Sequence, residues 1–248
     1  FPYFTTLAEV VYLGTNQGLC YKSRNKYGDF NLVEGTKGQV WVLKEIDGQL
    51  FCGHDDGAFI IENGAIVQAI NTTEGTWDFK KIEDSSDLIL LGNYNGLNVL
   101  EKANNKWTFR NKIEGFDVSS RFYEQLNNSI FLNHEFKGLY KLDIDKEYKL
   151  IKESNSITSI EKGIGSSFLK FSDYYYYSSA NGIYKYTESN QFEKDEEFSS
   201  LFKPYEDVST LLEVKGSENK LWRYADDNML IISPSSVTSK PQVEIIPI

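Results

Sequence analysis

The chain is short of several residue types, and each shortage excludes a class of protein. Its 248 residues include two cysteines, two histidines, five prolines and one methionine. Cys20 and Cys52 can form one disulfide at most, so the chain is not a disulfide scaffold. They also lack the close spacing of a metal knuckle or a redox pair. We expect both to be small side chains buried in strands.

Positive charge and long apolar runs are also scarce. Lys and Arg number 26 against 36 Asp and Glu, which leaves a formal net charge of −10 and no basic run. This balance repels a phosphate backbone, so we expect no contact with nucleic acid. No apolar stretch approaches the roughly 18 residues of a membrane span, so we expect no membrane segment. The chain begins at Phe1 without an initiator methionine, signal peptide or lipid motif, which indicates a mature or excised fragment.

Aromatic residues are abundant. Hydrophobic residues make up 40% of the chain and aromatic residues 15%, with 16 Tyr, 16 Phe and 4 Trp. This content is too high for a disordered tail and is sufficient to fill a core. Aromatic side chains favour strands, so the composition predicts a β protein.

A nine-residue motif recurs along the chain. It consists of three apolar residues, a small residue, a polar tip, a glycine and an aliphatic residue, as in Val11-Tyr12-Leu13-Gly14-Thr15-Asn16-Gln17-Gly18-Leu19. Clear copies occupy residues 50–58 and 89–97, and more degenerate ones occupy 130–139, 175–183 and 221–229. The second glycine falls at positions 18, 57, 96, 138, 182 and 228, so the spacings are 39, 39, 42, 44 and 46 residues. In the last copy Asn228 replaces glycine, and we expect it to supply the positive φ that Asn tolerates.

Each period contains four short strand patterns. An apolar stretch such as Val40-Trp41-Val42-Leu43 or Trp77-Asp78-Phe79-Lys80 precedes the motif, and the motif itself is two strands joined by the glycine-bearing tip. A polar turn such as Glu62-Asn63-Gly64 then leads to the fourth strand. No segment shows a sustained helical period. Four strands per repeat of about 40 residues predict an all-β protein, a β-propeller of four-stranded antiparallel blades. A β-sandwich is the alternative, but it does not explain a glycine at nearly constant spacing.

Six motifs predict about six blades over residues 1–238, although they also fit most of a seven-bladed ring. Residues 239–248 are predicted to be an exit strand or linker toward a following domain. Alternatively, Val243–Ile246 pair with the first blade and close the ring, because propellers protect their edge strands.

The motif resembles the two-component regulator propeller repeat, whose core reads approximately Leu-Trp-Ile-Gly-Thr-x-x-Gly-Leu. Residues 11–19 and 221–229 are the closest copies, and the latter keeps Leu221-Trp222. The resemblance implies the sensor propeller of a large regulator anchored in the inner membrane. Such a propeller lies in the periplasm or otherwise outside the cytoplasm and typically senses an oligosaccharide. A histidine kinase or helix-turn-helix output lies elsewhere in the parent protein.

The hairpin tips between the second and third strands are expected on one face, because rotation about the ring axis relates successive blades. Turn formation alone explains most Asn and Asp residues there. Tyr94 and Phe136 differ, because turns rarely need an aromatic ring, and a ring flanked by amides and carboxylates suits a sugar. The sequence therefore predicts a recognition surface near Tyr94, His134 and Phe136, with His54 and Asn93 as further candidates.

Catalytic motifs are missing from the sequence. It contains no Gly-x-Ser-x-Gly, no His-Glu-x-x-His and no Ser-x-Asp-x-Gly-x-x-Trp. His54 and His134 occupy corresponding tips, but the second and fourth blades of a propeller lie well apart, which disfavours a two-histidine metal site. Residues 143–147 resemble a calcium loop superficially and fit a hairpin turn better. We expect no catalytic residue, no metal site and no cofactor.

Three functions remain open. The preferred one is a non-enzymatic sensor that binds an oligosaccharide or another small ligand. The second is an interaction scaffold for a partner protein, or for self-association through the parent protein. The third is a hydrolase or lyase with a metal in the propeller channel.

Overall fold

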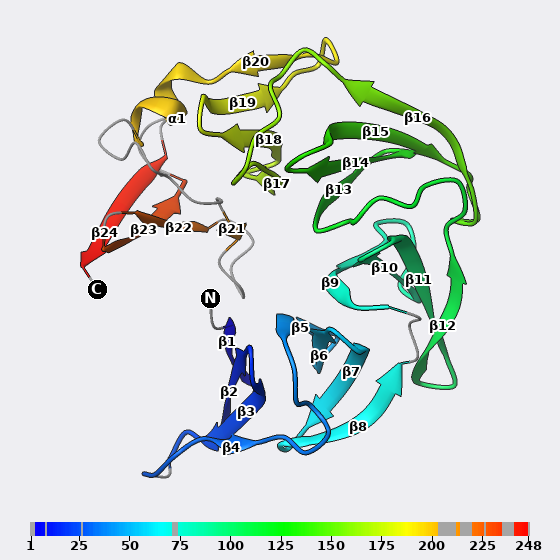
Figure 1. The fold of residues 1–248 in the computed structure, drawn as a ribbon, viewed down its shortest axis with the longest axis vertical. Helices are drawn as coiled ribbons and strands as arrows, with labels where there is room; N and C mark the ends of the chain where they lie inside the picture. Colours follow the sequence, from blue (N-terminus) through cyan, green and yellow to red (C-terminus); the bar gives the residue numbers. More distant parts are fainter. Residues whose placement is uncertain are drawn as a thin grey trace. The chain divides into compact units, whose positions relative to one another are not determined.

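The computed structural model describes residues 3–7, 9–25, 27–70, 74–202, 212–213, 220–225, 227–234 and 241–247 (Figure 1). The chain forms two compact units. The first consists of Phe1–Arg121 with Asp145–Ile151, and the second consists of Phe122–Ile144 with Lys152–Ile248.

The first unit contains three four-stranded sheets, which we number blades 1 to 3. Blade 1 is β1 (Tyr3–Leu7), β2 (Val10–Thr15), β3 (Gly18–Ser23) and β4 (Asn31–Leu32). Blade 2 is β5 (Val40–Ile46), β6 (Gln49–His54), β7 (Gly57–Glu62) and β8 (Ala65–Ile70). Blade 3 is β9 (Thr76–Lys81), β10 (Leu88–Asn93), β11 (Gly96–Ala103) and β12 (Lys106–Lys112).

The second unit contains the sheets that we number blades 4 to 6. Blade 4 is β13 (Phe122–Leu126), β14 (Ser129–His134), β15 (Gly138–Ile144) and β16 (Ile151–Ile157). Blade 5 is β17 (Ser167–Phe171), β18 (Tyr174–Ser179), β19 (Gly182–Tyr186) and β20 (Phe192–Lys194). Blade 6 is β21 (Leu212–Glu213), β22 (Leu221–Ala225), β23 (Asn228–Ser233) and β24 (Gln242–Pro247).

Every blade is a meander whose strands pair in chain order (Figure 1). The second and third strands are the two halves of the repeated motif, and the tip glycine begins the third strand in blades 1 to 5. Six four-stranded antiparallel blades are the architecture of a β-propeller, which confirms the predicted fold class and gives six blades. Residues 143–147 end β15 and begin the turn to β16, as the hairpin interpretation requires.

Strand alternation explains how a blade buries both of its faces. In β6, Leu50 and Cys52 lie in one buried cluster with Tyr12 of blade 1, while Phe51 lies in another with Phe79 of blade 3. Successive side chains of a strand point to opposite faces, so one strand serves two blade interfaces. Cys20 and Cys52 are free thiols, the first half-buried and the second buried.

The same alternation explains the run of tyrosines in β18. Tyr175 and Tyr177 lie in a buried cluster with Phe131 of blade 4, and Tyr176 lies in a cluster with Leu230 of blade 6. Three of the four tyrosines are therefore core packing within the second unit, whereas Tyr174 is 49% exposed.

The tip glycines meet two requirements at once. Gly18 and Gly96 have φ values of 130° and 97°, a region that side-chain-bearing residues rarely adopt. A Cβ atom at Gly18 would also lie 2.5 Å from the carbonyl oxygen of Thr36, and one at Gly96 would lie 2.4 Å from that of Phe116. The close approach of the following loop thus adds a reason for glycine that turn chemistry alone does not supply.

The last copy of the motif corrects one expectation. Asp227, with φ of 58°, adopts the left-handed conformation that we assigned to Asn228, and Asn228 instead begins β23. The positive φ is therefore displaced by one residue, while the strand register is kept, because Ala225 pairs with Asn228 as Thr15 pairs with Gly18 in blade 1. Asp226, in the same tip, lies outside the described residues.

The C-terminal segment belongs to blade 6. In β24, Val243 pairs with Ile232 and Ile246 pairs with Met229 of β23. The alternative pairing of Val243–Ile246 with the first blade is therefore wrong, because these residues complete the last sheet as its fourth strand. Ser239, Lys240 and Ile248 lie outside the described residues.

One short helix was not predicted. Helix α1 (Glu196–Ser200) begins after Asp195, whose side chain accepts the backbone N–H of Phe198. Its signals were an N-cap aspartate and two acidic residues in the first turn, but five residues are too few to show a helical period. Within the described residues, no helix has the length and hydropathy of a membrane span.

Candidate functional site

Two tryptophans occupy the same unusual position in successive blades of the first unit. Val40 pairs with His54 and Val42 pairs with Gly53, so Trp41 is an extra residue in β5. Likewise Thr76 pairs with Asn93 and Asp78 with Gly92, which leaves Trp77 as the extra residue in β9. A β-bulge of this kind redirects the side chain of the inserted residue.

The redirected tryptophans form a cluster with Tyr94. The ring centroids of Trp41 and Trp77 are 4.3 Å apart, and their planes are inclined by 49°. Tyr94, at the tip between β10 and β11, has its ring centroid 4.9 Å from Trp77 and 6.4 Å from Trp41. All three side chains are half-buried, so each one keeps part of its surface in solvent. We call this cluster the aromatic platform.

Asp55, at the tip between β6 and β7, fixes one side of the platform. Its Oδ1 accepts the indole N–H of Trp41 at 2.9 Å and the hydroxyl of Tyr94, and its Oδ2 accepts the backbone N–H of Gln39 at 3.3 Å. Partial burial raises the pKa of Asp55, but these hydrogen bonds outweigh burial and lower the pKa below its ordinary value. Burial, reinforced by the Asp55 carboxylate, raises the pKa of Tyr94 far above its ordinary value. At neutral pH the pair is therefore a carboxylate and a phenol.

The Trp77 end of the platform carries a cation. The indole N–H of Trp77 donates to Ser119 Oγ at 2.9 Å, and the guanidinium carbon of Arg121 lies 5.4 Å from the centroid of the Trp77 ring. This distance is within the range of a cation–π contact. Arg121 is half-buried, so the platform has an acidic edge at Asp55 and a basic edge at Arg121.

The ring separations decide what the platform can bind. An aromatic cage for a methylated ammonium holds the cation between its rings. Centroid distances of 4.3 and 4.9 Å leave no space for a methyl group between Trp77 and its neighbours. A ligand can therefore lie only against the outer surface of the platform, as an apolar face of a sugar does.

His54 and Asn93, two of the predicted site residues, are fully buried. His54 Nδ1 accepts the backbone N–H of Asp56 at 3.0 Å, and its Nε2 lies 3.3 Å from the carbonyl oxygen of Thr36. Asn93 Nδ2 donates to the carbonyl oxygen of Gly75 at 3.2 Å. These side chains hold the tips in place and present no surface to a ligand.

His134 and Phe136 lie in the second unit, at the tip between β14 and β15. His134 Nδ1 accepts the backbone N–H groups of Phe136 at 3.2 Å and of Lys137 at 3.3 Å. Burial, helped by Lys137, lowers the pKa of His134. The Phe136 side chain is 62% exposed. Their participation in one recognition surface with Tyr94 stays a prediction.

The sequence predicts Tyr94 as a site residue but not the two tryptophans that contact it. The repeat pattern places Trp41 and Trp77 only in the strands that precede the motif. A signal was present, because two of the chain's four tryptophans occupy the same place in consecutive repeats. The bulges that turn them toward Tyr94 have no comparable signature in the sequence.

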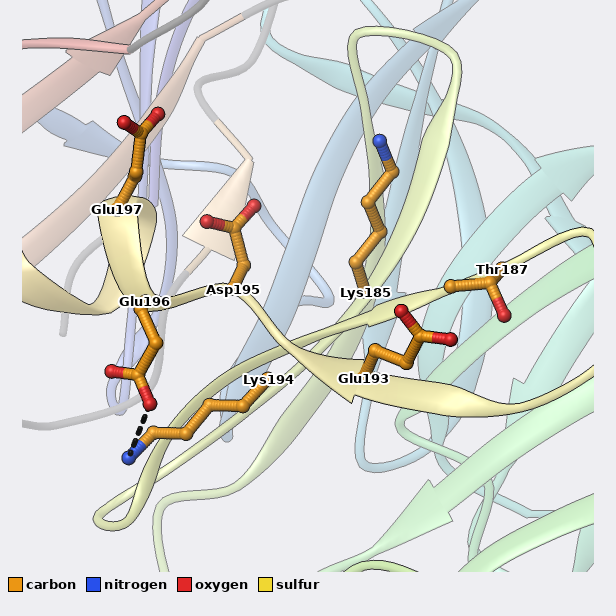
Figure 2. Close-up of a pocket in the computed structure, with 7 residues that line it drawn as sticks. All are labelled: Lys185, Thr187, Glu193, Lys194, Asp195, Glu196 and Glu197. Carbon is orange, nitrogen blue, oxygen red and sulfur yellow. Dashed lines mark ion pairs between the residues drawn. The ribbon is translucent and has the colours of Figure 1, made fainter.

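A hollow of about 310 Å³ lies in the second unit, between β19, β20 and the start of α1 (Figure 2). Its lining consists of Thr187 and charged side chains, and Lys194 and Glu196 point toward each other with Nζ and Oε1 3.8 Å apart. Asp195 is engaged as the N-cap of α1. Ligand pockets are mostly apolar with a few polar groups, so the composition of this hollow does not favour it as the site.

Among the residues that the structure describes, no group of three or more His, Cys, Asp or Glu side chains is placed to hold a metal ion. In the turn after β15, Asp145 Oδ1 accepts the backbone N–H groups of Lys149 at 2.7 Å and Leu150 at 2.9 Å. This carboxylate therefore stabilises the turn, as the hairpin interpretation of residues 143–147 requires.

Comparisons with known proteins support the fold. No protein-family model matches the chain, and no curated protein matches its sequence. Virginiamycin B lyase from Staphylococcus aureus is 12% identical with a TM-score of 0.62, and the match covers 100% of this chain and 84% of that one. The WD40 β-propeller domain of Doa1 is 14% identical with a TM-score of 0.61, over 95% of this chain and 79% of that one. The computationally designed Ika8 protein is 12% identical with a TM-score of 0.59, over 96% and 72%. At these identities the likeness shows the propeller fold alone.

Proposed function

We propose that this chain is a non-enzymatic ligand-binding propeller, that its ligand is a carbohydrate, and that the aromatic platform is the site. The observation that carries this proposal is the pair of bulges that bring Trp41 and Trp77 into contact beside Tyr94. An apolar sugar face stacks on such rings, and its hydroxyls bond to polar groups at the edge. Asp55, at the tip between β6 and β7, and Gln39, just before β5, supply those polar groups.

The wider role that we propose is that of a sensor module. The repeat motif resembles that of regulators that are anchored in a membrane and read an oligosaccharide outside the cytoplasm. This part of the proposal rests on the resemblance of the motif, which is an associational argument. The platform adds to it a site of the appropriate chemistry.

Protein interaction is the second candidate function. In the second unit, Phe136 and Ile164 are 62% and 76% exposed. Large exposed apolar side chains favour a protein-binding surface where they gather into a patch.

The test is a thermal-shift screen with neutral and acidic oligosaccharides, followed by the same screen on two variants. A ligand that binds only the folded chain raises the melting temperature. Trp41→Ala removes half of the tryptophan pair and is expected to weaken binding by about tenfold or more, as truncation of a central aromatic contact does. Phe136→Ala removes an exposed ring of the second unit and is the matched control, which should keep the shift.

An unchanged shift in a folded Trp41→Ala variant would move the site away from the platform. A shift that is lost in Phe136→Ala but kept in Trp41→Ala would place the ligand at the second unit's tip. The absence of any shift across the screen would argue against a carbohydrate and leave protein interaction as the better candidate.

A further inference from the structure

Blade 6 carries a charge at a repeat position that is uncharged in the other blades. The third residue of the motif is Arg223 in blade 6, and in blades 1 to 5 it is Leu13, Cys52, Leu91, Leu132 and Tyr177. This side chain is fully buried in blades 2 to 5, and Arg223 itself is only 5% exposed. A core position in blade 6 is therefore occupied by an arginine, a residue that is rarely buried unless it is paired.

The Arg223 side chain faces a buried apolar cluster between blades 5 and 6. Arg223 pairs with Leu230 across β22 and β23, and residues directly opposite on paired strands point to the same face. Leu230 packs in that cluster with Phe171 of β17 and with Phe202, which follows α1. The guanidinium carbon of Arg223 lies 5.0 Å from the centroid of the Phe202 ring, so the cation stacks on the edge of the cluster.

No anionic group in the described part of the chain balances this charge. The Nε atom of Arg223 is buried and has no hydrogen-bond partner there. Burial lowers the pKa of Arg223 to about 10, and no charged neighbour among the described residues counteracts it. The side chain still carries its charge at neutral pH. An aromatic face offsets only part of the hydration that a buried cation loses, and buried charges in proteins are therefore paired.

We propose that Arg223 is the binding site of a small organic monocarboxylate, which lies between blades 5 and 6 and pairs with the edge of the guanidinium. The fork of N–H groups matches the two oxygens of a carboxylate, while the guanidinium face stays on Phe202. One cation balances one negative charge, and the neighbouring cluster is apolar, so a short apolar acid fits better than a phosphate or a dicarboxylate.

This site is separate from the aromatic platform. Arg223 and Phe202 belong to the second unit, whereas Trp41, Trp77 and Tyr94 belong to the first. The inference therefore does not depend on the proposed carbohydrate function. Because Arg223 is only 5% exposed, access to it is narrow, which also favours a small ligand over an oligomer.

The experiment measures the melting temperature of the full chain in sodium acetate, propionate and butyrate. Sodium chloride, sulfate and phosphate are compared at the same pH of 7 and the same ionic strength. A ligand that binds only the folded chain raises the melting temperature. At about a hundredfold excess over Kd, we expect a monocarboxylate to raise it by about 5 °C or more above its value in chloride. Calorimetric titration with the same acid should then give one site per chain.

Arg223→Met distinguishes a ligand site from a structural role. Removing an unpaired buried charge should leave the melting temperature in chloride unchanged or higher, and it should abolish the carboxylate shift. Arg223→Lys keeps the charge but loses the fork, so it should keep only part of the shift. Arg24→Met is the matched control, because Arg24 is an exposed arginine of the first unit, and it should keep the whole shift.

Three results overturn the inference. A carboxylate shift that survives Arg223→Met would place the acid elsewhere. A marked loss of stability of Arg223→Met in chloride would show that the fold itself balances the charge of Arg223. The absence of any carboxylate shift in the wild-type chain, or equal shifts with sulfate or phosphate, would exclude a monocarboxylate as the ligand.

Discussion

Blades 2 and 3 differ from blades 4 and 5 at one repeat position, and the difference sets where a site can form. Gly53 and Gly92 in blades 2 and 3 face bulged strands that carry Trp41 and Trp77. At the same position blades 4 and 5 have Asn133 and Ser178, and β13 and β17 pair in unbroken register.

Side chains fill the space in blades 4 and 5 that the bulge fills in blades 2 and 3. Asn133 Nδ2 donates to Ser166 Oγ at 2.9 Å, and Ser178 Oγ lies 2.9 Å from Ser167 Oγ. Ser166, which corresponds to Trp41 and Trp77, is fully buried. The bulged strands of blades 2 and 3 place a half-buried tryptophan at the position where blade 5, with an unbroken register, buries Ser166.

The largest expected effect is a loss of stability when Gly53 of blade 2 is replaced by serine, the residue that blade 5 has at the same position. A Cβ atom at Gly53 would lie 2.6 Å from the carbonyl oxygen of Thr76 and 2.7 Å from Val42, so Gly53→Ser forces a backbone to move. We expect a loss of about 2–3 kcal/mol in the free energy of unfolding, as overpacking produces. Chemical denaturation measures it. Gly163→Ser is the matched control, because a Cβ atom there meets nothing within 4 Å. Equal stability of the two variants would contradict the close approach.

A smaller effect is expected at Gly75, which precedes β9. The corresponding positions before β5 and before Arg121 carry side chains, those of Gln39 and Ser119. At Gly75, however, a Cβ atom would lie 2.6 Å from the Tyr94 ring. Gly75→Ala should displace Tyr94 from the platform and weaken carbohydrate binding by about tenfold, the loss of one stacking contact. Calorimetric titration checks it, with Gly163→Ala as the control. Wild-type affinity in Gly75→Ala would exclude Tyr94 from the site.

The smallest expected effect is a pH dependence centred on Asp55. Its pKa is lower in the folded chain than the unfolded value of about 3.9, so its contribution to stability is present above that pH and is lost as the pH falls through the folded pKa. We expect wild type to melt above Asp55→Asn at pH 7, and the gap to narrow below about pH 4. Melting curves between pH 2 and 7 measure the gap.

The control for this prediction is Asp56→Asn, because the Asp56 side chain is 75% exposed. Surface substitutions of this kind usually change stability by less than about 0.5 kcal/mol. A wild-type advantage over Asp55→Asn that persists unchanged down to pH 2 would show that the carboxylate charge does not stabilise the platform.

The sequence predicted what depends on local chemistry. Tip glycines require a positive φ, polar turns such as Glu62-Asn63-Gly64 require left-handed residues, and strand alternation requires apolar pairs such as Leu50 and Phe51 to face opposite ways. These requirements repeat with the blade, so their period revealed the fold. The short helix after Asp195 was not predicted, because five residues are too few to show a helical period.

The candidate site was only partly predictable, because its residues are distant in sequence and come together through blade packing. Tyr94 stands out in the sequence because turns rarely need an aromatic ring. His54 and Asn93 are also candidates by sequence, but both are buried and hydrogen-bonded. Whether a tip residue faces solvent depends on the loop that precedes the next blade, and that loop has no fixed pattern.

The sequence by itself determined the number of repeats, the strands and the core of this protein, because backbone conformation and side-chain alternation are set by near neighbours in the chain. Only the tertiary structure decided that Trp41, Trp77, Tyr94 and Arg121 share one surface. A bulge shifts a side chain by a single position, and its cost is offset by packing against the adjacent blade, so no segment carries that information alone.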